Sequence, residues 1–245
     1  MTKRVGRIVG VFGVLALAAG PATAQLIPDP WTVTVSVEGG TYIPTRAYGQ
    51  NAGDSPTLGF LQPQAKADAG GRIGGSIMVQ LPSVLFSVGI AGSTTFGATV
   101  ESSSEVCDVL DETNTPECAR FDSDVTVSDV YGVFRIHRRV GLPGVRPFIN
   151  LGLGLRRYSF DKASCSAITL VERSRYICER GNGLMHDQTQ PLLLFGVGAR
   201  FNTGPVSVFA QLNDVLSPYD SGEATGEAEG QNDLVITGGL TFRIF

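Results

Sequence analysis

The strict alternation of the last thirteen residues, 233–245, constrains the fold more than any other feature of the chain. They read D-L-V-I-T-G-G-L-T-F-R-I-F. One alternating set is almost wholly apolar, and it comprises Leu234, Ile236, Gly238, Leu240, Phe242 and Ile244. The other set mixes threonine and glycine with the charge of Arg243. This period of two predicts a long β-strand with one apolar face. A tilted strand of about 9–11 residues is long enough to cross a bilayer.

Seven further segments repeat the alternation, so the closing strand has partners of its own kind. We expect strands at 31–42, 72–81, 84–100, 125–137, 145–158, 192–201 and 206–214. Long polar connections, at 44–69, 101–124, 159–190 and 216–232, alternate with short turns. This rhythm places both chain ends on the short-turn side. Because a sheet in lipid must close to pair its edges, we expect an all-β fold, an eight-stranded antiparallel up-and-down transmembrane β-barrel.

The first 24 residues have the features of a cleaved secretory signal peptide. Three basic residues precede the apolar stretch 8–19, and Ala22-Thr23-Ala24 forms a small-residue cleavage site. The alternative is an anchoring helix, but about 12 apolar residues are too few to span a membrane. The barrel domain is therefore expected at 25–245.

Composition narrows the function classes. Removing the signal segment leaves 16 Lys and Arg against 23 Asp and Glu, a net charge of −7. Such a balance argues against a nucleic-acid partner.

The chain has four cysteines, Cys107, Cys118, Cys165 and Cys178. An even number behind an export signal predicts disulfides, with three possible connectivities. Proximity in the chain favours Cys107–Cys118 and Cys165–Cys178. The alternative, a metal site, lacks C-x-x-C and histidine at ligand spacing, so we expect no metal and no cofactor.

The signal peptide, the strand rhythm and the ending G-G-L-T-F-R-I-F together resemble the eight-stranded bacterial outer-membrane barrels of the OmpA and OmpW types. The resemblance covers residues 25–245. It implies a location in the outer membrane of a Gram-negative cell, contact with outer-membrane lipids, and insertion by the barrel assembly machinery. That machinery would read Leu240, Phe242 and the terminal Phe245, although Phe245 stands one position off the apolar face.

The inward-facing polar positions are the best candidates for a functional site. The alternation assigns to the lumen Glu38, Arg72, Arg135, Arg156, Arg200, Gln211 and Arg243. One carboxylate among several arginines predicts a buried salt-bridge network, since unpaired buried charges are costly. An eight-stranded barrel has room for side chains or one small ligand. A packed interior and a narrow gated pore both fit.

Other polar groups carry weaker signals. His186 and Asp187 lie in a long connection with Ser164, Ser166 and Ser174, a set that could form a Ser-His-Asp catalytic triad. No G-x-S-x-G motif accompanies them. His137 is expected to be solvated at the short-turn rim. The acidic residues of 216–232 lack a calcium-loop spacing and are expected to be solvated; they are Asp220, Glu223, Glu227 and Glu229.

Aromatic side chains are expected to form a girdle at each membrane interface. The short-turn girdle would contain Trp31, Phe148, Phe201 and Phe245, and the long-loop girdle Tyr42, Phe96 and Tyr158.

Four functions fit these patterns. The favoured one is a non-enzymatic outer-membrane barrel whose disulfide-pinned loops have a structural role or bind an extracellular surface ligand. The alternatives are a narrow channel for small or hydrophobic solutes, a lipid-modifying membrane enzyme, and a soluble lipocalin-like barrel with inverted faces.

Overall fold

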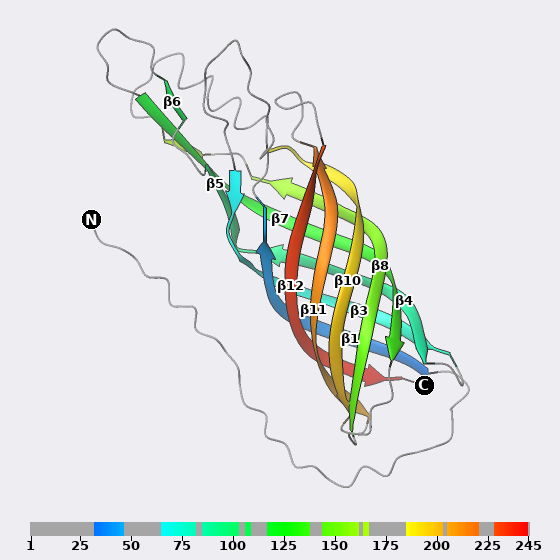
Figure 1. The fold of residues 1–245 in the computed structure, drawn as a ribbon. Helices are drawn as coiled ribbons and strands as arrows, with labels where there is room; N and C mark the ends of the chain where they lie inside the picture. Colours follow the sequence, from blue (N-terminus) through cyan, green and yellow to red (C-terminus); the bar gives the residue numbers. More distant parts are fainter. Residues whose placement is uncertain are drawn as a thin grey trace, which may run out of the picture.

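Eight long antiparallel strands form a closed barrel (Figure 1). The computed structural model describes residues 32–46, 65–81, 85–102, 106–108, 117–137, 144–161, 164–166, 185–202, 205–220 and 228–244. The barrel strands are β1 (Thr32–Pro44), β3 (Gly70–Gln80), β4 (Phe86–Phe96), β7 (Glu117–His137), β8 (Val145–Phe160), β10 (Gln188–Asn202), β11 (Val206–Asp220) and β12 (Ala228–Arg243). Each barrel strand pairs with the next barrel strand in the chain. The all-β, eight-stranded up-and-down fold is thus confirmed, whereas the expected signal peptide at 1–24 lies outside the described residues.

Across the residues that the structure describes, no helix is long and apolar enough to pass through a membrane.

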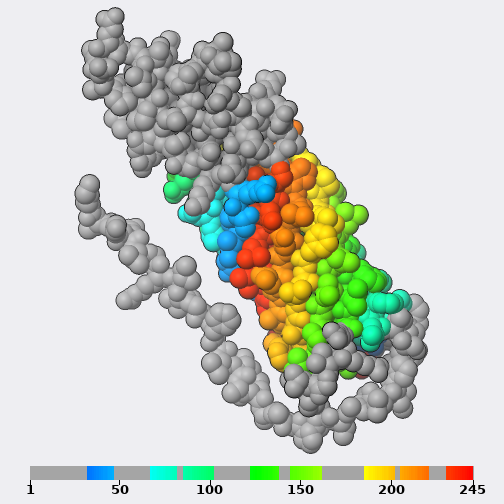
Figure 2. Space-filling view, in the orientation of Figure 1, coloured from blue at the N-terminus to red at the C-terminus, as the bar shows by residue number. Residues whose placement is uncertain are grey.

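The first and last strands close the barrel. β1 and β12 run antiparallel in a register that extends from Thr34 opposite Arg243 to Pro44 opposite Asp233. The space-filling view shows the blue surface of β1 beside the red surface of β12 (Figure 2). The beginning of β1 and the end of β12 therefore lie at the same end of the barrel, as the alternation of long and short connections predicts.

Burial along the barrel strands is inverted relative to a water-soluble sandwich. On β8, Leu153 is 70% exposed and Leu155 58% exposed, whereas Asn150 and Arg156 are almost fully buried. The outward apolar run of β8 extends from Val145 to Leu155. Ten residue steps of about 3.3 Å, inclined by about 40° to the barrel axis, correspond to a height of about 25 Å. That height matches the apolar band of a membrane barrel.

Several strands are longer than the sequence predicts, so part of the expected polar loops is sheet. β7 begins at Glu117 rather than at residue 125, β11 continues to Asp220, and β12 begins at Ala228. The extensions escape prediction because beyond the apolar band the outward face needs no apolar side chains, so the pattern fades while backbone pairing continues.

Four short strands extend the wall at the long-loop end. They are β2 (Ala65–Ala67), β5 (Ala98–Ser102), β6 (Val106–Asp108) and β9 (Ser164–Ser166), and β5, β6 and β9 all pair with β7. The predicted strand 84–100 is divided into β4 and β5 by Gly97, which has a φ of +65° that side chains other than glycine rarely adopt.

The predicted aromatic girdles are partly wrong. Tyr42, Tyr158 and Phe148 point into the barrel and are at most 3% exposed. Their type suggested the membrane interface, but their phase places them on the inward face, as the alternation of each strand requires. Phe96 and Phe201 do lie on the outside, and Trp31 and Phe245 lie outside the described residues.

Candidate functional site

The barrel interior is organised in layers, and the layer nearest the long-loop end is apolar and aromatic. It contains buried residues of the short strands and of β7, such as Val100 and Val127, together with Tyr42, Tyr158 and Tyr219. The rings of Tyr158 and Tyr219 meet edge-on, with centroids 5.2 Å apart. The sequence pattern predicts a polar interior and misses this small core. Of the residues named here only Tyr219 lies in a strand extension; the others occupy inward positions of predicted strands, where polar side chains were expected.

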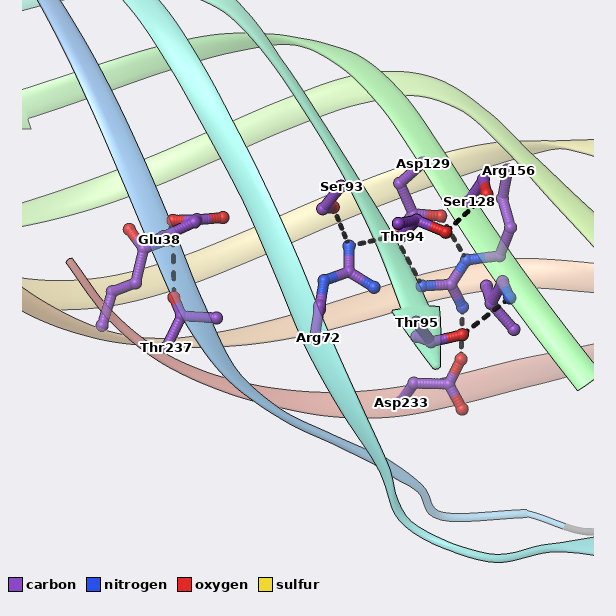
Figure 3. Close-up of polar contacts among 12 residues, drawn as sticks. Glu38, Arg72, Ser93, Thr94, Thr95, Ser128, Asp129, Arg156, Asp233 and Thr237 are labelled. Carbon is purple, nitrogen blue, oxygen red and sulfur yellow. Dashed lines mark hydrogen bonds and ion pairs between the residues drawn. The ribbon is translucent and has the colours of Figure 1, made fainter. Parts of the chain in front are cut away.

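An ionic layer crosses the lumen beneath it (Figure 3). The guanidinium of Arg156 on β8 donates to Asp129 of β7 through Nε at 2.8 Å and Nη2 at 3.1 Å. Its third nitrogen, Nη1, donates to Asp233 on β12. Because β8 and β12 are separated by two strands around the barrel, the Arg156–Asp233 ion pair joins opposite walls.

A second arginine completes this layer. Arg72 on β3 donates to Asp129 and to the hydroxyl of Ser93. The side chains of Arg72, Asp129, Arg156 and Asp233 are at most 2% exposed. Buried charges of this kind are tolerated only when they are paired and hydrogen-bonded, so the four groups act as one unit.

The prediction from sequence did not identify the two carboxylates of this layer, Asp129 and Asp233. The pattern suggested Glu38 as the single carboxylate, whereas the structure adds Asp129 and Asp233. The alternation along each strand could have identified them. Asp129 is two residues from inward-facing Tyr131, and Asp233 is four residues from inward-facing Thr237, so both share the inward face.

An amide layer lies next along the lumen. Arg135 donates to Asn150 (Nε to Oδ1, 2.7 Å), and Asn150 donates to Gln211 (Nδ2 to Oε1, 3.0 Å). Gln211 in turn donates to Glu38 (Nε2 to Oε2, 2.8 Å). Thr237 also faces Glu38 (Figure 3), with its hydroxyl 3.5 Å from the carboxylate. This chain of contacts again links strands on opposite sides of the barrel, from β7 to β1.

A small cavity adjoins the amide layer. Its lining includes Glu38, Tyr131, Arg135 and Gln211, and its free volume is about 10 Å³. That volume accommodates about one water molecule. The interior at this level is therefore filled by side chains rather than open.

The short-turn end of the interior is basic. Arg200 on β10 is only 8% exposed. His137, expected to be solvated, is instead 7% exposed, and its Nε2 lies 2.8 Å from the hydroxyl of Ser87. His137 shares the inward face of β7 with Arg135, so its side chain is buried although it lies at the end of the strand.

Arg243 lies at the rim rather than inside the lumen. It shares the phase of inward-facing Thr241, but it is the last residue of β12 and is exposed at the rim. The other six predicted lumen residues, Glu38, Arg72, Arg135, Arg156, Arg200 and Gln211, do lie inside the barrel.

The residues suggested for a catalytic triad have other contacts. The carboxylate of Asp187 accepts from the backbone amide of Phe160 and the hydroxyl of Ser159, each at 3.0 Å. The amide of Phe160, followed by the smaller effects of Ser159 and Arg157, lowers the pKa of Asp187 below its usual value. The ring of His186 faces that of Tyr219, 6.4 Å away. The side chains of Ser164 and Ser166, and all of Ser174, lie outside the described part of the chain.

The cysteines can be located only in part. The β6–β7 register places Cys107 directly opposite Cys118. In the β7–β9 pairing, Cys165 is opposite Phe121. Cys178 lies outside the described residues.

The described ranges contain no group of three or more His, Cys, Asp and Glu side chains that could hold a metal ion. Of the acidic loop residues, Asp220 is exposed at the end of β11, whereas Glu223 and Glu227 and the side chain of Glu229 lie outside these ranges.

Comparison with known proteins finds likeness at the level of fold. No protein-family profile and no curated sequence matches the chain. Among solved structures, neisserial surface protein A shares 12% identity, with a TM-score of 0.44 over 88% of this chain and 98% of that one. The outer membrane protein OprG from Pseudomonas aeruginosa shares 11% identity, with a TM-score of 0.42 over 89% and 97%. The outer membrane protease OmpT from Escherichia coli shares 14% identity, with a TM-score of 0.42 over 91% and 100%.

Identities and TM-scores this low do not carry a functional argument. The closed eight-stranded barrel itself confirms the fold that the sequence resemblance implies. Any function must rest on the geometry of this chain.

Proposed function

We propose that this chain is an outer-membrane barrel protein with a non-enzymatic role, in which a rigid barrel anchors loops that stabilise the envelope or bind a surface ligand. The observation that carries the proposal is the inversion of the two faces. Val130 and Leu153 are 67% and 70% exposed, while Arg156 and Asp129 are at most 1% exposed. In water this arrangement would leave the apolar face unsatisfied, whereas in lipid it is the expected one.

The inversion also argues against a soluble lipocalin-like barrel. Such a barrel would keep its apolar face inside and its charges outside. Here the charged groups of β7, β8 and β12 pair with one another across the lumen.

Fractionation tests the location. We expect the full-length protein to be cleaved after residue 24, to sediment with outer membranes, and to need detergent for extraction. Folded protein should migrate faster than heated protein in a denaturing gel. A monomer that stays in solution without detergent would refute the membrane assignment.

The barrel is proposed to be closed to solutes. The Arg156–Asp233 ion pair and the chain from Arg135 to Glu38 both cross the lumen. Recording across a planar bilayer should therefore reveal no steady unitary conductance. Conductance that is lost in a variant with a bulkier lumen side chain would favour the narrow channel instead.

The non-enzymatic assignment rests on the contacts of Asp187. Both of its oxygens are used by Ser159 and Phe160, so its carboxylate serves to hold the β8–β10 connection. Lipid A from cells that express the protein should keep all of its acyl chains. Loss of an acyl chain that His186→Ala abolishes would establish a lipid-modifying enzyme.

The loop disulfides are part of the proposal. Directly opposite residues in an antiparallel pair have β-carbons about 4.5–5.5 Å apart, within reach of a disulfide after slight adjustment. The register of Cys107 with Cys118 therefore supports that connectivity over the two alternatives. Alkylation and peptide mapping of Cys107→Ser should find one new free thiol, at Cys118; a free thiol at Cys165 or Cys178 instead would exclude this pairing.

The closing strand is proposed to carry the assembly signal. Leu240 and Phe242 lie on the outward face, 41% and 40% exposed, where an insertion machine could reach them. Deleting Phe245 should reduce insertion into the outer membrane, with deletion of an internal loop residue as the control. Normal insertion without Phe245 would restrict the signal to Leu240 and Phe242.

A further inference from the structure

The short-turn end of the barrel interior contains two arginines directly opposite each other. Arg146 on β8 is the register partner of Arg200 on β10. Directly opposite residues of an antiparallel pair have their side chains on the same face, and like charges at such positions destabilise a sheet. Arg146 is exposed at the mouth, whereas Arg200 is buried deeper in the lumen. The two cations therefore line one path from the solvent into the barrel.

Two further basic groups face the same region from β7. The positive charges of Arg200, Arg135 and Arg146 all act on His137. The ring of Phe148 joins the group: the guanidinium carbon of Arg135 lies 4.1 Å from its centroid, and the imidazole of His137 lies 6.3 Å from it. Two basic groups of β7 thus lie beside one aromatic ring, and the charges of Arg146 and Arg200 act on one of them, His137.

These basic groups have unused hydrogen-bond capacity. Arg135 Nη1, His137 Nδ1 and Arg200 Nε are buried and make no hydrogen bond with any described residue. Their side chains are 4%, 7% and 8% exposed. Leaving a buried polar group without a partner is costly, and more so for a charged one.

Compensating negative charge is scarce at this end. Glu38 acts on Arg135, but its carboxylate already accepts from Gln211. Within the described ranges, neither Arg146 nor Arg200 has a carboxylate partner. By contrast, each arginine of the ionic layer is paired, so the two ends of the same lumen differ in charge balance.

We propose that the short-turn end of the lumen is a binding site for a small phosphate-class oxyanion, held by Arg200 and Arg146 with His137 beside it. A guanidinium offers a planar fork of donors that matches phosphate oxygens. An eight-stranded barrel leaves room for one small ligand. The anion would relieve the repulsion between the two opposite arginines and take up the unused donor of Arg200.

Binding of inorganic phosphate to the intact barrel tests the proposal. The protein is folded in nonionic detergent free of phosphate and phospholipid, at constant ionic strength, and phosphate is titrated by calorimetry and by thermal unfolding. We expect saturable binding of one phosphate per barrel and a rise in the unfolding temperature. Arg200→Gln should weaken binding at least tenfold and, because it removes a repelling charge, should unfold at a higher temperature than the unchanged protein when phosphate is absent.

Two matched variants complete the design. Arg146→Gln, at the exposed mouth, should also weaken binding and keeps the test valid if Arg200→Gln fails to fold. Arg157→Gln, an exposed arginine on the same strand at the other end of the barrel, should bind phosphate as the unchanged protein does. No saturable binding, or equal binding by Arg146→Gln and the unchanged protein, would overturn the site. Displacement of phosphate by phosphatidylglycerol micelles would assign the site to a lipid headgroup and overturn the proposal of a soluble anion.

Discussion

Replacing Asp129 by asparagine should destabilise the barrel more than any comparable change at its surface. Asp129 accepts hydrogen bonds from Arg72 and twice from Arg156, all inside the lumen. The amide has almost the same shape, so the change removes charge without opening a cavity. Asp129→Asn therefore isolates the electrostatic role of this carboxylate.

The magnitude follows from what each arginine retains. Arg156 keeps its ion pair with Asp233. Among the described residues, Arg72 keeps a hydrogen bond to the hydroxyl of Ser93 and a weaker electrostatic interaction with Glu38. Arg72 therefore loses its ion-paired carboxylate, and breaking one buried ion pair costs about 3–5 kcal/mol. Since the amide oxygen still accepts a hydrogen bond, we expect a loss near the lower end, about 3 kcal/mol.

Urea unfolding of the barrel in lipid vesicles measures this loss. The fluorescence of the single tryptophan, Trp31, and the gel mobility of unheated samples follow the transition. Asp68→Asn is the matched control because Asp68 is exposed in the link between β2 and β3. A loss at Asp129 below about 1 kcal/mol, the range of exposed pairs, or equal to that of Asp68→Asn, would refute the reasoning.

A double variant distinguishes the cost of an unpaired buried charge from a non-specific loss of barrel stability. Adding Arg72→Met to Asp129→Asn removes the cation that lost its partner. The two changes together should therefore cost less than their separate costs added, by about 2 kcal/mol. Simple additivity would mean that the two groups do not act as one unit.

Three further predictions test the barrel from outside. Leu153→Arg should destabilise the barrel in lipid by about 2 kcal/mol or more, with Leu153→Met as control; no loss on unfolding from vesicles would contradict a lipid-facing position. Asp214 faces outward between Leu212 and Leu216, which are 41% and 37% exposed, so Asp214→Leu should raise the urea midpoint in lipid, and a lower midpoint would reveal a partner for the carboxylate. The depressed pKa of Asp187, which lies beyond the apolar band, means that its contribution to stability is complete above its ordinary pKa of 3.8 and is lost as the pH falls through the lower folded value; Asp187→Asn should remove this acid dependence, and an NMR-detected carboxyl pKa at or above the ordinary value would count against it.

The transmembrane part of the strands could be predicted because lipid imposes a rule on every second residue. Ile149, Leu153 and Leu155 alternate with inward groups on β8, and the same pattern identified all eight barrel strands. This alternation is no longer imposed beyond the apolar band, towards the long-loop end of the barrel. The early start of β7 at Glu117 and the short strand β6 were therefore missed, since only backbone pairing maintains the sheet there.

The position of a residue in the inward–outward alternation of its strand predicted the direction of its side chain better than the residue type did. The inward positions of Arg72, Arg156 and Arg200 follow from alternation, and so does that of Tyr158, which its aromatic character had suggested for the membrane interface. Arg243 shows the limit of phase, since an inward-phased residue at the end of a strand reaches the rim instead.

The sequence by itself determined the closed antiparallel barrel, its inverted faces and most of the inward residues, because these properties depend on near neighbours along one strand. Only the tertiary structure decided which inward residues meet. The pairing of Arg156 with Asp233 spans 77 residues, and that of Arg146 with Arg200 depends on the register of β8 against β10. A contact across a lumen is set by the stagger of strands around the whole barrel, and no local pattern in a single chain records that stagger.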